Sequence, residues 1–142
     1  MLSISVTTAN MVYLQPISMR KKYILPIVLM ILDLWTKASM GPVIFNSGAA
    51  FSSFSHLDLK PIIFFTCLLL LIYYLKLPNP ELWLIFFLAG ALGNAYDRLI
   101  FDAVRDWIQI PYFPAIFNLA DVYFCGAVAL YFFQSIKKTS RS

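Results

Sequence analysis

Four long apolar stretches divide the chain, and polar residues gather at their ends. The stretches cover about residues 23–36, 61–75, 82–99 and 117–133. Each approaches the roughly 17 to 25 residues that a membrane-spanning helix needs. Pro78 and Pro80, with Asn79 between them, interrupt the helical pattern and predict a tight turn between the second and third stretches. The pattern therefore predicts four spanning helices.

Composition agrees with a membrane protein. Of the 142 residues, 61% are hydrophobic and 13% are charged, whereas a soluble domain carries roughly 25% charged residues. The net charge of +4 comes from basic clusters that flank the first and last stretches, which is typical of topology signals and argues against nucleic-acid binding. Cys67 and Cys125 lie in separate apolar stretches, and His56 is the single histidine, so we expect no disulfide, metal or cofactor.

The distribution of charge predicts an orientation. With the N-terminus in the cytoplasm, seven basic residues lie inside: Arg20, Lys21, Lys22, Lys76, Lys137, Lys138 and Arg141. Four lie outside: Lys37, Lys60, Arg98 and Arg105. This asymmetry follows the positive-inside rule and predicts that both termini are cytoplasmic. The aspartates then lie in the outer half of the membrane or beyond it, where they predict an outward-facing site.

The first residues differ from the rest of the chain. Residues 1–18 lack the basic start of a signal peptide and are too mixed for a span, whereas Met19 followed by basic residues resembles a natural beginning. We expect residues 1–18 to be a disordered extension or the product of an upstream start. Residues 19–142 are expected to form a single membrane domain.

Polar residues in the first half form two clusters. Asp33 and Lys37 have the i,i+4 spacing that places them on one helix face, where an ion pair alone would be structural. Asn46, before the small residues Ser47 and Gly48, could hold an extended peptide or orient a carboxylate. A turn with aromatic anchors at the membrane surface is the alternative for this second cluster.

Two further clusters occupy the second half. Gly90 and Gly93 allow close helix packing, and Asn94, Asp97 and Arg98 project on one side, with Asp97 and Arg98 expected to pair. Asn118 is a candidate N-cap, and Asp121 follows in the first turn of the last helix. Capping alone could explain Asp121, and Asp106 could lie in a solvated loop. The cost of a carboxyl beside so apolar a helix argues for partners in the interior.

Five motifs carry a resemblance: DLWTK at 33–37, NSGAAF at 46–51, GNAYDR at 93–98, VRDW at 104–107 and FNLAD at 117–121. In this order and on this four-span frame, the chain resembles the lipoprotein signal peptidase family, also called signal peptidase II. The resemblance implies an all-α integral membrane protein of the bacterial inner membrane, with four transmembrane helices and a small extracellular β/loop element. The implied activity is an intramembrane aspartic endopeptidase that removes signal peptides from prolipoproteins, on the amino side of the diacylglyceryl-modified cysteine.

The resemblance also implies roles for individual residues. Asp106 and Asp121 would be the catalytic pair, sharing one proton and needing no metal or cofactor. The supporting residues would be Asp33, Lys37, Asn46, Gly48, Asn94, Asp97, Arg98, Asn118 and Ala120. Asparagines and Arg98 would position the pair and the substrate backbone. The expected partners are diacylglyceryl-prolipoproteins and membrane lipid, with no nucleic acid and no obligate protein partner.

Two departures from the family leave alternatives open. Only eight residues separate Lys37 from Asn46, where the family inserts a longer segment, and Trp107 stands in place of the usual phenylalanine. A shortened loop would suit a non-catalytic or altered-specificity paralogue that binds lipopeptides. Intramembrane carboxylates would also suit a small ion or proton transporter.

Overall fold

The computed structural model describes residues 19–47 and 60–139, so the expectations for residues 1–18 and for Gly48 lie outside the described ranges. The helices are α1 (Met19–Ser39), α2 (Lys60–Lys76), α3 (Leu82–Phe101) and α4 (Leu119–Thr139). The strands are β1 (Ile44–Asn46), β2 (Val104–Asp106), β3 (Ile108–Gln109) and β4 (Ile116–Phe117). The described chain is thus mostly helical, and each helix overlaps one of the apolar stretches seen in the sequence.

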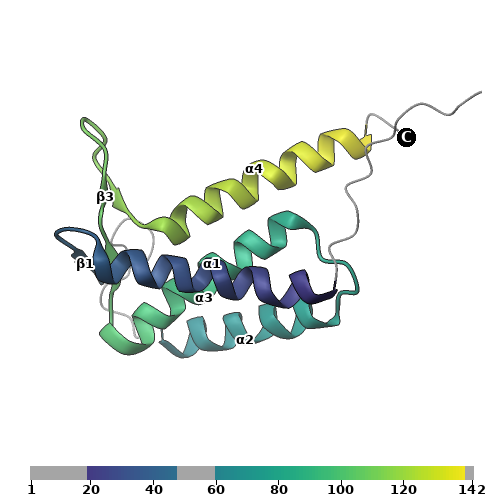
Figure 1. The fold of residues 1–142 in the computed structure, drawn as a ribbon, viewed down its shortest axis with the longest axis horizontal. Helices are drawn as coiled ribbons and strands as arrows, with labels where there is room; N and C mark the ends of the chain where they lie inside the picture. Colours follow the sequence, from purple (N-terminus) through teal and green to yellow (C-terminus); the bar gives the residue numbers. More distant parts are fainter. Residues whose placement is uncertain (1–18, 48–59, 140–142) are drawn as a thin grey trace, which may run out of the picture.

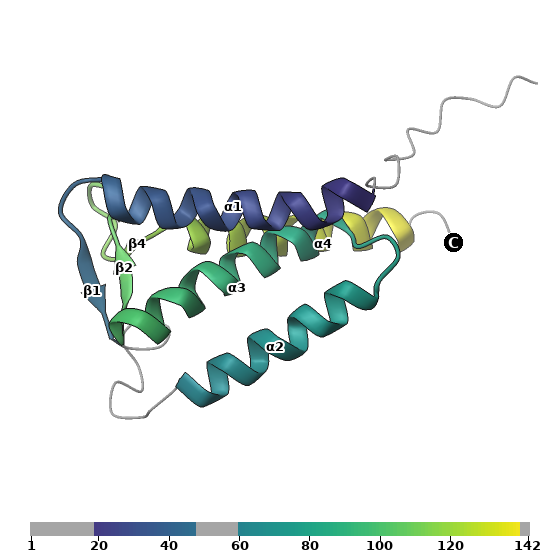
Figure 2. The ribbon, with the colours of Figure 1, turned by 60° about the horizontal axis from the view of Figure 1, so that its bottom comes forward.

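Helix α3 is the centre of the arrangement. It packs against α1, α2 and α4, and Figure 2 shows it lying between α1 and α2. The strands lie together at one end of the helices, and α1 begins and α4 ends at the opposite end (Figures 1 and 2). Every polar residue near the strand end of α1, α3 or α4 is therefore brought towards one region.

The outer surface of the helices is strongly apolar. A small core of Tyr74, Leu84, Ile85 and Leu88 lies between α2 and α3. By contrast, Ile24, Phe65, Leu69 and Phe133 are each more than half exposed. Within the described residues, two segments, Leu82–Phe101 and Leu119–Lys137, are long and apolar enough to cross a membrane. An apolar surface this extensive is what lipid, rather than water, would cover.

A buried lysine joins α1 to the end of α2 that leads into the turn. The Lys22 ammonium donates to the carbonyl of Leu77 and to that of Leu75 at 3.3 Å. The Tyr74 hydroxyl donates to the Lys22 carbonyl at 2.5 Å. Because the last carbonyls of a helix lack partners within it, this ammonium satisfies the C-terminus of α2.

The strands bring distant residues of the chain side by side. β1 and β2 are antiparallel, so Ile44 lies opposite Asp106 and Asn46 opposite Val104. β3 and β4 form a second antiparallel pair, in which Ile108 lies opposite Phe117. We expected the fourth helix to begin near 117, but Phe117 is in β4 and α4 begins at Leu119. The backbone pairing with β3 draws Phe117 out of the helix.

Candidate active site

Two aspartates from different elements lie close together at the strand end of the helices. Asp106 ends β2 and is 3% exposed, and Asp121 lies in the first turn of α4 and is half-buried. Asn118 contacts both of them. Its side-chain amide donates to Asp106 Oδ1 at 2.7 Å, and its Oδ1 accepts the backbone N–H of Asp121 at 3.1 Å. One asparagine therefore connects the two carboxyl-bearing residues.

The first turn of α4 is closed by a reciprocal cap. Asn118 accepts the backbone N–H of Asp121, and Asp121 Oδ2 accepts the backbone N–H of Asn118 at 3.0 Å. This is the geometry of a capping box, with asparagine at the N-cap and aspartate three residues later. The predicted N-cap is confirmed. The cap also fixes the direction in which the Asp121 carboxyl points.

Asp106 is held from a second side by β1. The Asn46 amide donates to Asp106 Oδ2 at 3.2 Å, across the β1–β2 pair. Burial raises the pKa of Asp106 above the ordinary aspartate value, and the nearby Asp121 raises it further, while the bonds from Asn118 and Asn46 oppose the shift. The alternative of a solvated loop for Asp106 is wrong. Its carboxyl binds a proton more readily than an exposed one does.

A buried charge cluster lies beside this pair. Lys37 is 1% exposed, and its ammonium lies 2.8 Å from Asp33 Oδ2 and 3.3 Å from Asp97 Oδ2. The predicted pairing of Asp33 with Lys37 is confirmed. Asp97 Oδ1 is contacted by the Arg105 guanidinium at 2.8 Å, and Asp97 Oδ2 accepts the Arg105 backbone N–H at 3.0 Å. Asp97 therefore pairs with Lys37 and Arg105. The expected pair of Asp97 with the adjacent Arg98 is wrong.

Arg105 is the residue that the sequence interpretation missed. It lies eight positions after Asp97. The two residues meet because the chain reverses at Asp102, whose backbone is in the left-handed conformation with φ of 58°. Its place inside the VRDW motif is the only sequence signal that points to it. The reversal itself has no clear sequence pattern, since Asp is not the residue most expected at positive φ.

Close approach of helices completes the cluster. Asp33 Oδ1 accepts the backbone N–H of Ala120 at 2.9 Å, which joins α1 to the first turn of α4. A Cβ at Gly93 would collide with the Asp33 carboxylate, and a Cβ at Gly90 would lie 2.8 Å from the Ala120 carbonyl oxygen. Gly93 therefore allows α3 to approach α1, and Gly90 allows α3 to approach α4, which confirms the close helix packing predicted from the sequence.

Asn94 connects the charge cluster to the carboxyl pair. Its Oδ1 accepts from Lys37 at 2.8 Å, and its amide nitrogen donates to Asp121 Oδ1 at 3.2 Å. Arg98, one turn further along α3, lies within electrostatic reach of both Asp106 and Asp121 and donates to the Ser47 carbonyl at 3.4 Å. Of the supporting residues predicted from the sequence, all those in the described ranges thus lie in or beside this site.

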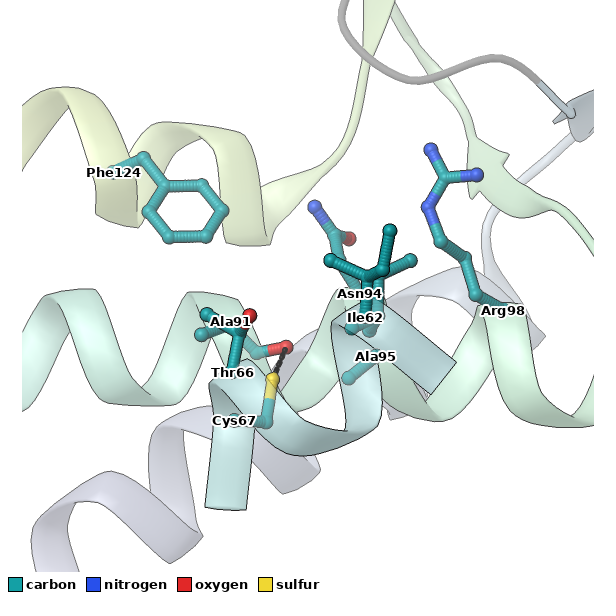
Figure 3. Close-up of a pocket in the computed structure, with 9 residues that line it drawn as sticks. Ile62, Thr66, Cys67, Ala91, Asn94, Ala95, Arg98 and Phe124 are labelled. Carbon is teal, nitrogen blue, oxygen red and sulfur yellow. Dashed lines mark hydrogen bonds between the residues drawn. The ribbon is translucent and has the colours of Figure 1, made fainter. Parts of the chain in front are cut away.

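A cavity of about 200 Å³ lies next to the carboxyl pair, between α2 and α3. Its lining residues are Ile62, Ile63, Thr66, Cys67, Ala91, Asn94, Ala95, Arg98 and Phe124. Figure 3 shows Asn94 and Arg98 pointing to the same side, with Cys67 and its contact to Ala91 deeper among the helices. Most of the lining is apolar, and of its polar residues Asn94 donates to Asp121. Across residues 19–47 and 60–139, no cluster of His, Cys, Asp or Glu could hold a metal ion.

The fold and the site define a helical membrane protein with two aspartates at one end of its helices, each hydrogen-bonded to Asn118. The model of the family described as signal peptidase (SPase) II matches residues 25–137. The chain belongs to this family.

Relatives named lipoprotein signal peptidase agree with the assignment. The chain is 35% identical over 98 residues to that of Caldanaerobacter subterraneus subsp. tengcongensis, covering 65% of this chain and 68% of the relative. It is 46% identical over 61 residues to that of Chromobacterium violaceum, covering 39% and 37%. It is 38% identical over 90 residues to that of Chlamydia trachomatis serovar D, covering 56% and 53%. The last two matches span about half of the relative or less.

A solved structure described as a bacterial membrane enzyme has the same fold. It superposes with a TM-score of 0.73 over 89% of this chain and 94% of that one, at 23% identity. A second structure with that description gives a TM-score of 0.66 at 22% identity, over 86% and 96% of the two chains. At this identity the likeness concerns the fold alone.

Proposed function

We propose that this protein is an intramembrane aspartic endopeptidase that removes signal peptides from prolipoproteins, cutting on the amino side of the diacylglyceryl-modified cysteine. The observation that carries the proposal is the connection of Asp106 and Asp121 through Asn118. Two carboxyls held together in partial burial favour a state with a single shared proton. That state provides one acid and one base for hydrolysis of a peptide bond.

The surroundings of the pair support a division of labour. Burial raises the pKa of Asp106, which favours Asp106 as the protonated member, and Asp121 then serves as the base. Asp121 takes a proton from water, the water oxygen attacks the scissile carbonyl carbon, and the Asp106 proton moves to the carbonyl oxygen. When the tetrahedral intermediate collapses, the carbon–nitrogen bond breaks, the leaving nitrogen takes the proton from Asp121, and one hydroxyl proton of the intermediate returns to Asp106. The pair then again holds one proton, on Asp106, and Asp121 is again ionised.

The substrate would approach from the membrane. The cavity between α2 and α3 is lined mostly by apolar side chains, and one of its lining residues, Asn94, donates to Asp121. A signal peptide bound along this cavity would bring its backbone to the carboxyl pair. The diacylglyceryl chains could stay in lipid, where each buried methylene contributes roughly 0.8 kcal/mol.

The orientation proposed from the sequence suits this route. We propose four membrane-spanning helices, both termini on the cytoplasmic side of the bacterial inner membrane, and the carboxyl pair near the outer interface. In support, the start of α1 and the end of α4 lie at the end opposite the strands (Figure 2). The β1–β2 pair would then lie on the outer side beside the substrate. No metal or cofactor takes part in the proposed reaction.

A cleavage assay tests the proposal. Purified protein in detergent is given a diacylglyceryl-modified prolipopeptide, and the products are identified by mass spectrometry. We expect a new N-terminus at the lipidated cysteine, and a rate loss of at least roughly 100-fold in both Asp106→Asn and Asp121→Asn. Asp102→Asn is the matched control, because Asp102 has a largely exposed side chain at the end of α3 and should leave the rate unchanged.

Three outcomes would contradict the peptidase. Full activity in either variant of the carboxyl pair would exclude the shared-proton mechanism. Tight binding of the lipopeptide without product would indicate a binding paralogue. Ion flux through proteoliposomes without peptide cleavage would indicate a transporter.

A further inference from the structure

The Asn94 side chain lies between a cation and a carboxylate. Lys37 Nζ donates to its oxygen at 2.8 Å, and its nitrogen donates to Asp121 Oδ1 at 3.2 Å. The three residues come from α1, α3 and the first turn of α4. Asp121 is thus connected through one amide to a lysine on another helix.

The chemistry of the two ends allows one orientation of this amide. An ammonium can only donate hydrogen bonds, and an ionised carboxylate can only accept them. Rotating the Asn94 amide by half a turn would place its NH₂ against Lys37 and its oxygen against Asp121, so that both hydrogen bonds would become repulsive contacts. Lys37 therefore determines which group faces Asp121.

The charge of Lys37 is already balanced without Asp121. Its ammonium forms ion pairs with Asp33 and Asp97 and donates a hydrogen bond to Asn94, and Arg105 balances the second aspartate. All the side-chain atoms of Lys37, Asp33 and Asp97 are buried. The influence of Lys37 on Asp121 is therefore expected to pass mainly through the direction of the amide, and less through net charge.

We propose that Lys37 is a positioning residue for Asp121, acting through Asn94: it holds the amide so that an N–H group faces the Asp121 carboxylate. The inference rests on the proposed function, in which Asp121 is the base. An N–H donor favours the ionised carboxylate over the protonated one. The shared proton consequently stays on Asp106, as the reaction requires.

Other groups also act on Asp121. The carboxyl of Asp106 on β2 and the guanidinium of Arg98 on α3 both interact electrostatically with Asp121, the first repelling and the second attracting its negative charge. The backbone N–H of Asn118 donates to its second oxygen. On α1, Asp33 pairs with Lys37. None of these depends on how the Asn94 amide is turned. A change in amide orientation should therefore alter Asp121 in a distinct way.

The test must separate positioning from folding. Lys37→Met alone would leave the buried Asp33 carboxylate without its cation, whereas Asp97 keeps Arg105. It is therefore combined with Asp33→Asn, so that one charge of each sign is removed. An amide at position 33 keeps an oxygen for the Ala120 N–H. The matched control is Lys60→Met with Asp102→Asn, the same exchange at an ion pair of 2.5 Å with partly exposed side chains.

For the Lys37 and Asp33 double variant we expect kcat to fall roughly 10- to 100-fold, because the hydrogen bond from Asn94 to the charged Asp121 carboxylate is lost. KM should stay within about twofold of the wild-type value. The acidic limb of the kcat–pH profile, where the carboxyl pair takes up a second proton, should move to higher pH. The control should match wild type in kcat, KM and profile. Adding the double change to Asn94→Leu should cause no further loss, because the connection is already broken.

Asn94→Asp provides a second test that leaves the charge cluster intact. It keeps an oxygen for Lys37 but replaces the N–H facing Asp121 by a second oxygen. We expect a loss of at least roughly 100-fold that lessens at low pH, where the new carboxyl binds a proton and can donate. If Lys37 needs only a buried acceptor, this variant will cleave like wild type, which would overturn the proposal.

Two more results would overturn it. One is a folded Lys37 and Asp33 double variant with wild-type kcat and pH profile, and the other is losses that multiply when the changes are combined with Asn94→Leu. Failure of the wild-type protein to cleave the lipopeptide is a different result, because it contradicts the proposed function itself.

Discussion

Replacement of Gly93 by alanine should disrupt the site at its most crowded point. The new methyl group would collide with Asp33 Oδ2 and lie 3.2 Å from its carboxyl carbon, so the carboxylate must move. That carboxylate accepts the buried Ala120 N–H at 2.9 Å and pairs with Lys37 at 2.8 Å. The substitution therefore acts on two buried interactions at once.

The size of the effect follows from these two interactions. An unsatisfied buried N–H costs about 1–3 kcal/mol. A broken buried ion pair costs about 3–5 kcal/mol. Partial loss of each, less a gain of up to about 1 kcal/mol for alanine over glycine in a helix, gives a net loss of about 3 kcal/mol in the free energy of unfolding. For a chain of this size, that lowers the melting temperature by about 10 °C.

Thermal unfolding of the detergent-solubilised protein measures this prediction, with peptide cleavage as a second readout. Gly126→Ala is the matched control, because a Cβ at Gly126 meets nothing within 4 Å. Its melting temperature and cleavage rate should stay near the wild-type values. A Gly93→Ala protein that melts within about 2 °C of wild type and retains full cleavage would refute the reasoning.

Three other perturbations address the carboxyl pair and the substrate. Asn118→Ala should lower stability by roughly 1 kcal/mol through loss of the cap, which circular dichroism melts measure. It should also lower kcat strongly in the cleavage assay, because it removes one of the two hydrogen bonds to the Asp106 carboxyl. Because burial raises the pKa of Asp106, the folded state binds its proton more tightly than the unfolded state does. Its contribution to the free energy of unfolding is therefore greatest below the ordinary aspartate pKa and is lost as the pH rises through the higher pKa of the folded state. In melts at a series of pH values, Asp106→Asn should remove this pH dependence. An unlipidated copy of the prolipopeptide should be cleaved poorly or not at all, and equal turnover of both peptides would point to a general signal-peptide-degrading protease.

Local spacing explains the parts of the site that the sequence could predict. Asp33 and Lys37 are one helical turn apart, and Asn118 and Asp121 have the separation of a capping box, so each pair is specified within four residues. The turn after α2 is likewise specified by its prolines. Such contacts depend little on the rest of the fold, so the sequence alone is enough to predict them.

Contacts between distant elements could not be predicted in this way. β1 and β2 have three residues each, too few for a periodic pattern, yet their pairing places Asn46 against Asp106. In the sequence Lys22 is one of several basic residues that flank the first span, but in the structure it is 2% exposed and joins α1 to α2. Arg105 reaches Asp97 only after the reversal at the end of α3. In each case the partner is chosen by the tertiary fold.

Charge balance gives a physical reason for the composition of the whole site. Lys37 and Arg105 neutralise Asp33 and Asp97, so these four buried or half-buried groups sum to zero. The carboxyl pair then faces Arg98. If Asp106 and Asp121 were both ionised, one negative charge would be uncompensated in a partly buried site. If both were protonated, the positive charge of Arg98 would be uncompensated. One shared proton makes the site neutral, and this is the protonation state that hydrolysis by an aspartate pair requires.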